Sequence, residues 1–142
     1  MAGRRLNDSM GEYVVTQLVK TMIKKRIQIE GAKVLVLGLS FKENCPDVRN
    51  TKVIDIIHEL QKYNVEIDVH DPWINANEAN REYSITPISQ PVSNQYDGII
   101  LAVAHEQFIK MGIEKIRALG KDNHVLYDLK YLFTKEDTDI RL

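Results

Sequence analysis

Cysteine is scarce in this chain, and long apolar runs are missing altogether. Its one cysteine, Cys45, excludes an internal disulfide framework and is typical of a reducing compartment, so we expect a cytoplasmic protein. No window approaches the roughly 18 apolar residues of a membrane helix, and the N-terminus has no stretch of the signal-peptide type. We therefore expect no membrane partner.

An excess of charge of either sign is also absent. The 142 residues include 19 Lys and Arg against 20 Asp and Glu, for a net charge of -1. This balance gives no reason to expect nucleic acid as a partner, and any phosphate must be bound by a few local groups. With 44% hydrophobic and 27% charged residues, the composition is that of a soluble globular protein with one domain and perhaps one appended element.

The chain begins with an amphipathic helical pattern. Apolar residues recur at helical spacing from Asn7 to about Arg26, and the pattern breaks near Gly31. Such a helix cannot bury its apolar face alone, so it must pack on the following domain, on a second copy or on a missing neighbour. We expect residues 1–30 to form this helix and residues 31–142 to form the domain, in a chain cut from a longer one.

The next segment predicts a βαβ unit. Residues 33–37, dense in Val and Leu, predict a strand buried on both faces. A helix follows, with Asn50 or Thr51 as its cap, and alternating apolar residues over 65–69 predict a second strand that ends at Asp71-Pro72. Strand, helix and strand in this order normally form a right-handed unit with parallel strands.

The C-terminal half continues the alternation. Residues 98–103 predict the clearest buried strand, and residues 125–128 the last one. Between them lie two short helical patterns, at 107–111 and 113–119, with Gly120 as a stop. The polar stretch 73–94 predicts a short helix at 76–82 and an edge strand around Ile85. The fold class is α/β: a Rossmann-like, mostly parallel sheet flanked by helices and preceded by a long N-terminal helix.

The loop after the first strand is the main candidate site, because ligands of open parallel sheets bind at the carboxyl ends of the strands. It lacks the G-x-G-x-x-G and P-loop patterns. It does place Phe41 beside Lys42, which suits a ligand with an apolar face and a phosphate. Arg49 offers a planar fork for phosphate oxygens that Asp47 can orient, near a helix N-terminus. Alternatively, Phe41 is core, Lys42 is solvated, and Asp47 and Arg49 form a surface ion pair.

Residues 38–51, GLSFKENCPDVRNT, resemble the G-L-x-F-K-x-x-x-x-D-x-R-x-[ST] segment of the UDP-glucose/GDP-mannose dehydrogenase family, where it opens the C-terminal domain. Residues 3–10 are similar to the end of that family's central helix. His70-Asp71-Pro72 is similar to its Y-D-P, and Asp128-Leu129-Lys130 to its D-x-[KR]. These pieces occur in order at appropriate spacings. The sequence of residues 43–46, ENCP, looks most like the corresponding segment of members that act on UDP-N-acetylhexosamines or their uronates.

The resemblance implies roles for individual residues. Phe41, Lys42 and Lys130 would bind the UDP-sugar, although Lys130 stands where many members have Arg. Arg49, oriented by Asp47, would reach the NAD diphosphate held by another domain. The family oxidises the sugar C6 alcohol to a carboxylate for polysaccharide synthesis, and its central helix forms a homodimer interface, which falls on residues 1–30. Its nucleophilic cysteine and its NAD fingerprint precede that helix, so we expect no catalytic residue in this chain.

Other candidates are weaker. Cys45 is expected to be a structural or incidental thiol, and none of the four histidines pairs with a second ligand at metal spacing, so no metal site is expected. His105 is expected to cap the following helix, and Trp73 to pack. A phosphoacceptor signalling domain is excluded, because Gly38 and its neighbours stand where an acidic pair is needed. A stand-alone nucleotide-binding or regulatory module stays open.

Overall fold

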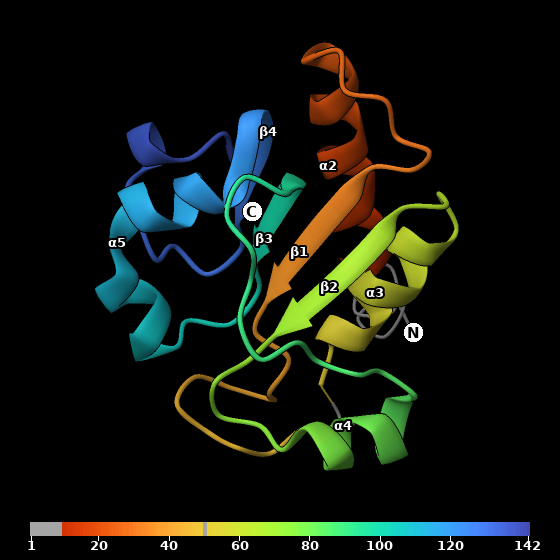
Figure 1. Ribbon diagram of the computed structural model, residues 1–142, viewed down its shortest axis with the longest axis vertical. Coiled ribbons are helices and arrows are strands. Elements are labelled where there is room, and N and C mark those ends of the chain that lie inside the picture. The colour runs from red at the N-terminus through yellow and green to blue at the C-terminus, as the bar shows by residue number, and fades with distance from the viewer. Residues whose placement is uncertain (1–9, 50) are drawn as a thin grey trace.

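The computed structural model describes residues 10–49 and 51–142 and confirms the Rossmann-like α/β fold (Figure 1). Five parallel strands lie in the order β2-β1-β3-β4-β5. The strands are β1 (Lys33–Leu37), β2 (Glu66–His70), β3 (Tyr96–Leu101), β4 (Gly120–Asp128) and β5 (Ile140–Arg141). The helices are α2 (Met10–Lys24), α3 (Val53–Gln61), α4 (Ala76–Tyr83), α5 (Glu106–Leu119) and the short 3-10 turn η1 (Lys135–Asp137).

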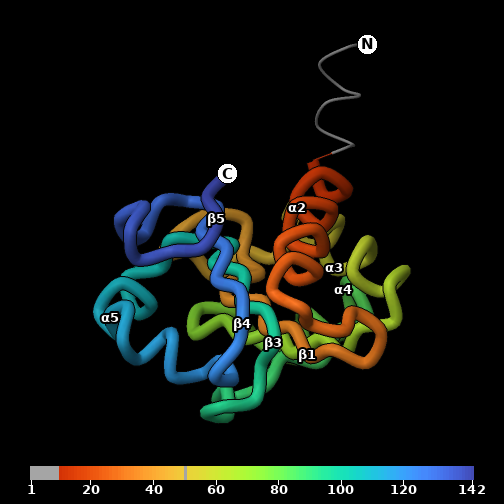
Figure 2. The backbone as a smooth tube through the Cα atoms, turned by 90° about the horizontal axis from the view of Figure 1, so that it is seen from above, coloured from red at the N-terminus to blue at the C-terminus, as the bar shows by residue number. Residues whose placement is uncertain are grey.

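The central strands are buried on both faces, as their Val- and Leu-rich sequences predict. In β1, Val34 and Val36 pack toward α2 and α3, whereas Leu35 and Leu37 pack toward α5. Successive side chains of a strand point to opposite faces, so this short run supplies both cores. Figures 1 and 2 show α5 on one side of the sheet and α2 and α3 on the other.

Helix α2 packs on the domain that follows it, one of the three partners that its amphipathic pattern allows. Its inner face is fully buried against α3 and the sheet through Val14, Val15, Leu18 and Met22. Its described part spans Met10–Lys24 and ends just before the predicted end near Arg26, and residues 7–9 lie outside the described part of the chain.

Several predicted details are confirmed. The two helical patterns before Gly120 are present, joined across a kink at Gly112, whose φ of 82° favours glycine. The short helix in the polar stretch is α4. Thr51 acts at the start of α3, where its Oγ1 accepts the Val53 N–H at 3.2 Å, although the N-cap position itself is Lys52. The alternative cap, Asn50, lies outside the described residues.

Two predictions about strands are wrong. No edge strand forms around Ile85, because Pro87 has no N–H to donate to a ladder; only Ile88 pairs, donating its N–H to the Val69 carbonyl at 2.8 Å. Residues 125–128 are not the last strand either. The chain returns as the two-residue β5, which pairs with the end of β4 and is too short to show a periodic pattern.

The contact between α2 and α3 yields a test. A Cβ on Gly11 would lie 2.8 Å from the backbone carbonyl carbon of Asp55, closer than packed atoms tolerate. Gly11→Val should therefore lower the free energy of unfolding by about 1–3 kcal/mol, measured by urea denaturation, even though valine favours helix over glycine. Lys20→Val, at an exposed position of the same helix, is the control and should change little. Equal stability of the two variants would contradict close packing at Gly11.

Candidate functional site

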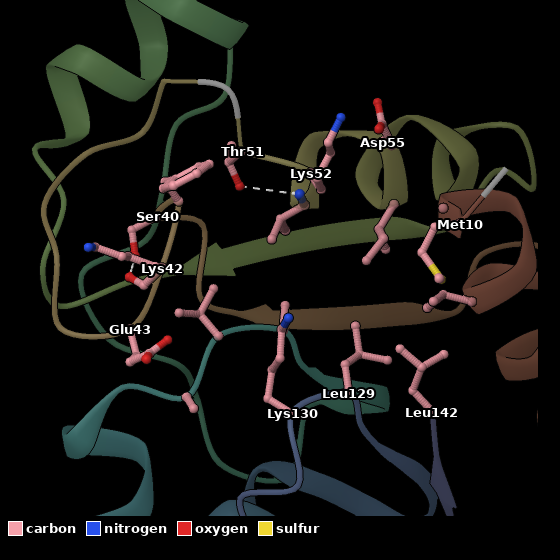
Figure 3. A pocket seen from close by; sticks show the side chains of 18 residues that line it. Met10, Ser40, Lys42, Glu43, Thr51, Lys52, Asp55, Leu129, Lys130 and Leu142 are labelled. Atoms are coloured by element: carbon pink, nitrogen blue, oxygen red, sulfur yellow. Dashed lines mark hydrogen bonds between the residues drawn. The ribbon is translucent and has the colours of Figure 1, made fainter. Parts of the chain in front are cut away.

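A pocket of about 230 Å³ lies at the carboxyl ends of the parallel strands, beside the β1–α3 loop (residues 38–49) (Figure 3). Its lining comes from α2, this loop, the start of α3, the segments after β3 and β4, and the last residue of the chain. The lining residues are Met10, Gly11, Val14, Ser40, Phe41, Lys42, Glu43, Thr51, Lys52, Val53, Asp55, Ile56, Ala102, Val103, Ala104, Leu129, Lys130 and Leu142. The fold thus brings Phe41, Lys42 and Lys130 together from distant parts of the sequence.

Phe41 lies at the rim of the pocket with 56% of its surface exposed, so the alternative that it is a core residue is wrong. Its backbone N–H donates to the Asp47 carbonyl at 2.7 Å, which closes the β1–α3 loop on itself. Lys42 is also exposed, and in Figure 3 its ammonium points away from Lys130. An exposed ring beside an exposed ammonium leaves both groups available to a ligand.

Lys130 points its ammonium into the pocket (Figure 3), and a buried carboxylate holds the turn that carries it. Asp128, at the end of β4, is fully buried. Its Oδ1 accepts the N–H groups of Lys130 at 3.3 Å and Leu132 at 3.1 Å, and its Oδ2 accepts that of Phe133 at 2.9 Å. The sequence motif contained Asp128, but its role as the anchor of this turn was missed.

Asp47 and Arg49 are not part of the pocket. Arg49 donates its Nε–H to Asp47 Oδ1 at 3.1 Å, and 70% of its side chain is exposed. The hydrogen bonds from Arg49 lower the pKa of Asp47, and those to Asp47 raise the pKa of Arg49. The surface ion pair is therefore present, and such an exposed pair contributes little to stability.

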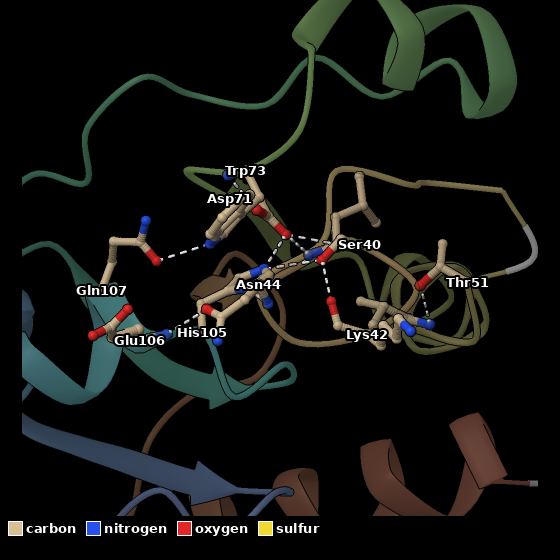
Figure 4. A network of polar contacts seen from close by, with 11 residues as sticks. Ser40, Lys42, Asn44, Thr51, Asp71, Trp73, His105, Glu106 and Gln107 are labelled. Atoms are coloured by element: carbon tan, nitrogen blue, oxygen red, sulfur yellow. Dashed lines mark hydrogen bonds and ion pairs between the residues drawn. The ribbon is translucent and has the colours of Figure 1, made fainter.

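A second buried carboxylate, Asp71, organises the other side of the loop (Figure 4). Its Oδ2 accepts the N–H groups of Leu39 at 2.7 Å and Ser40 at 2.9 Å, and its Oδ1 accepts that of Trp73 at 2.8 Å. Burial raises the pKa of Asp71, but the hydrogen bonds from His105 and these three N–H groups outweigh it, so the pKa lies below its ordinary value. The carboxylate is thus charged and matched by donors.

His105 occupies the N-cap position of α5, but its side chain makes no capping hydrogen bond, contrary to the expected role. Its ring is fully buried, and Nδ1 accepts the Asn44 N–H at 2.9 Å. The ring proton therefore resides on Nε2, which lies 2.9 Å from both Asp71 Oδ2 and Ser40 Oγ. The cap comes from Asn44 instead, whose Oδ1 accepts the Glu106 N–H at 2.9 Å. The signal for this arrangement was a histidine at the ligand edge of the sheet.

Ser40, His105 and Asp71 do not form a hydrolytic triad. In a triad the carboxylate accepts from the ring nitrogen opposite the one that faces the serine. Here both Ser40 and Asp71 share Nε2, and the opposite nitrogen is occupied by a backbone N–H. The Ser40 hydroxyl also donates to the Lys42 carbonyl at 3.0 Å. The cluster is built to hold backbone in place, with no activated nucleophile.

The remaining candidates show no chemistry of their own. Cys45 is a free, partly buried thiol in the loop. Trp73 packs near the His105 ring, at 6.3 Å between ring centroids, and donates its indole N–H to Gln107 Oε1 at 2.9 Å. Over the described ranges 10–49 and 51–142, no group of three or more His, Cys, Asp or Glu could hold a metal ion. No helix in that part of the chain combines the length and apolar character needed to cross a membrane.

The Asp71 cluster generates a pH-dependent prediction. Asp71→Asn places an amide where donors converge, and should lower the free energy of unfolding by about 3 kcal/mol at neutral pH. Because folding lowers the pKa of Asp71, its contribution is complete above the unfolded value of about 3.9 and is lost as the pH falls through the folded value.

Urea unfolding at neutral pH and at about pH 3 should therefore show a gap between wild type and Asp71→Asn that narrows in acid. The exposed Asp122→Asn is the matched control and should show no gap at either pH. A gap that widened on acidification would contradict the charged state of Asp71.

Comparisons with known proteins agree with this geometry. Over all 142 residues the chain is 62% identical to UDP-N-acetyl-D-glucosamine 6-dehydrogenase of Pseudomonas aeruginosa and 58% identical to that of Salmonella typhi, of whose lengths it covers 34% and 33%. It therefore spans about a third of these relatives.

Solved structures share the fold. UDP-D-ManNAc dehydrogenase from Pyrococcus horikoshii matches 99% of the chain with a TM-score of 0.80 at 22% identity, over 32% of its own length. UDP-glucose dehydrogenase from Pyrobaculum islandicum matches 96% with a TM-score of 0.72 at 27% identity, over 30% of its length. The sequence model of the UDP-glucose/GDP-mannose dehydrogenase family, UDP binding domain, matches residues 35–135. This chain belongs to the UDP-glucose/GDP-mannose dehydrogenase family and contains its UDP-binding domain.

Proposed function

We propose that this chain is the UDP-sugar-binding domain of an NAD-dependent UDP-N-acetylhexosamine 6-dehydrogenase, which oxidises the C6 alcohol of the sugar to a carboxylate. The observation that carries the proposal is the pocket at the carboxyl edge of the sheet, which Phe41, Lys42 and Lys130 all line. The names of the Pseudomonas and Salmonella relatives favour an N-acetylated hexosamine, or its uronate, as the sugar. We place this activity in the cytoplasm, in the synthesis of polysaccharide precursors.

The pocket suits part of a nucleotide sugar. Among the side chains of the lining, three lysines, Lys42, Lys52 and Lys130, outnumber the two acidic residues, Glu43 and Asp55, and give these side chains the sign that a diphosphate requires. The start of α3 also lines the cavity, and the positive end of the helix dipole favours an anion there. The apolar wall of the pocket offers a surface on which a flat ring can pack.

The size of the pocket indicates that it is shared. At about 230 Å³ it is smaller than the roughly 300–1,000 Å³ of pockets that enclose a drug-sized ligand. A UDP-sugar would therefore leave part of its surface uncovered here. We infer that the reacting sugar end is enclosed by another domain of the full-length protein, which would also supply the catalytic cysteine.

Arg49 and Asp47 fit a role toward a cofactor held by another domain. They lie outside the pocket, and the exposed guanidinium can bind phosphate oxygens from a partner surface. The sequence has no dinucleotide fingerprint, so this chain would contact NAD from one side only. Oxidation of the alcohol to a carboxylate releases two hydrides and consumes one water, so two NAD molecules would accept the hydrides in turn. The residues of this chain would orient the UDP-sugar and NAD.

The proposal also includes a dimer interface, formed by the outer face of α2. Tyr13 and Ile23 are exposed at 52% and 59%, although the inner face of the helix is buried in the core. These two side chains lie among polar ones such as Lys20 and would supply the apolar part of a surface that a partner covers. We propose that this face packs on a second copy in the full-length protein.

The binding role can be tested on the chain itself. Isothermal titration calorimetry with UDP-N-acetylglucosamine should show weak binding, which Lys42→Ala and Lys130→Ala each weaken by about tenfold or more through loss of a charge-assisted contact. Lys115→Ala, an exposed lysine of α5, should bind as wild type does. The chain should reduce no NAD. Turnover by this chain would overturn the assignment of catalysis to another domain, and absence of binding would overturn the assignment of the pocket.

The cofactor role requires the full-length protein. Arg49→Ala should raise the KM for NAD by about tenfold and leave the KM for the UDP-sugar near that of wild type, since Arg49 lies outside the pocket. Arg49→Lys should recover only part of the loss, because an ammonium cannot make the bidentate contact. A change confined to the KM for the UDP-sugar would show that Arg49 serves the sugar instead.

A further inference from the structure

We propose that His105 and Asn44 are positioning residues for the UDP-sugar: together they hold the β1–α3 loop in the shape that presents Phe41 and Lys42 to the pocket. The inference rests on the function proposed above. Neither His105 nor Asn44 lines the pocket, so in this geometry they act through the loop and not by touching the ligand.

The tip of the loop is pinned by Asn44. Its backbone N–H donates to His105 Nδ1 and its Oδ1 accepts the Glu106 N–H, both at 2.9 Å, so one residue ties the loop to the ring and to the start of α5. Asn44 has a φ of 54°, in the left-handed region that asparagine adopts more readily than most residues. The residue type thus suits both the backbone shape and the two bonds.

The root of the loop is pinned by the same ring. The Nε2–H of His105 is shared between Asp71 and Ser40, and the Ser40 hydroxyl donates to the Lys42 carbonyl (Figure 4). One buried ring therefore contacts the loop at Ser40 and at Asn44, on either side of Phe41 and Lys42. Because both ends of this short segment are fixed, the two exposed side chains start from a defined backbone.

The arrangement needs a neutral ring. Protonation of His105 would place a hydrogen on Nδ1, directly against the Asn44 N–H, and two donors cannot share a bond. The groups that surround the ring come from the end of β2, the loop and the start of α5. They are Asp71 at the ring nitrogen, His70 across the Phe108 ring, and Lys42, Glu43, Cys45 and Glu106 on the neighbouring backbone. Of these, Asp71 hydrogen-bonds to the ring through Nε2, and a charged Asp71 does nothing to relieve the clash at Nδ1.

The decisive experiment is calorimetry of UDP-N-acetylglucosamine binding to this chain at about pH 7.5 and about pH 5.5, across the range in which histidines titrate. A UDP-sugar is the proper probe because its diphosphate has no terminal phosphate that titrates near pH 6. Wild-type affinity should fall about three- to tenfold on acidification. His105→Gln should bind about tenfold more weakly at pH 7.5 and show little further loss at pH 5.5.

Matched variants separate positioning from stability. His58→Gln, at an exposed histidine of α3, should keep the wild-type affinity and pH dependence. Lys130→Ala should bind weakly yet keep the wild-type pH dependence, because the hydrogen bonds of the His105 ring are intact in this variant. Asn44→Asp retains an acceptor for the Glu106 N–H and should restore most of the affinity that Asn44→Ala loses. Urea unfolding of each variant shows that the comparison is made on folded protein.

The outcomes distinguish this inference from the proposed function. Wild-type affinity and a wild-type pH profile in both His105→Gln and Asn44→Ala would overturn the positioning role and leave the UDP-sugar pocket standing. An unchanged pH profile in His105→Gln alone would remove the histidine from the inference. No binding by wild type at pH 7.5 would overturn the inference together with the function on which it rests.

Discussion

The ligand edge of this domain depends on one buried anion. The Asp71 carboxylate lies beside the end of β1 because the parallel register places His70 opposite Leu37. It collects the N–H groups of Leu39, Ser40 and Trp73 together with a ring nitrogen. A buried charge is tolerable only when donors of this number and quality surround it. These hydrogen bonds fix the backbone conformation of Leu39 and Ser40 where the loop leaves β1, and this conformation shapes the adjoining wall of the pocket.

The same physical device occurs at the next ligand-bearing turn of the sheet. Asp128 gathers three backbone N–H groups after β4 and holds the backbone from which Lys130 extends. Both carboxylates are buried and hydrogen-bonded to backbone N–H groups, and Asp71 also to the His105 ring, so neither faces an anionic ligand in the pocket. The cations at the site, by contrast, have no fixed partner within the lining. The two buried carboxylates therefore fix the backbone of this edge, whereas the lysine side chains can adjust to a bound ligand.

The sequence predicted what depends on periodicity and missed what depends on tertiary contact. Buried strands such as residues 33–37 need apolar residues in every position, and this pattern is visible locally. The convergence of Phe41, Lys42 and Lys130 followed from strand ends meeting at one edge and from the family motif. The inward orientation of Asp71 and His105 could not be predicted, because a polar residue after a strand has the same local pattern whether it faces solvent or core. β5 was invisible for a related reason. Its pairing is supported by Asp139, which accepts from Arg117 and the Leu126 N–H, contacts far away in sequence.

Helix α2 couples two properties that are usually separate. Met10, Gly11 and Val14 line the pocket, whereas Val15, Leu18 and Met22, a turn or two further along, belong to the hydrophobic core. The shape of the pocket is therefore correct only when the helix is docked. Any ligand that binds there binds the docked state alone, and by thermodynamic linkage it must raise the free energy needed to detach the helix. Ligand binding in the pocket and docking of α2 on the sheet are therefore thermodynamically coupled.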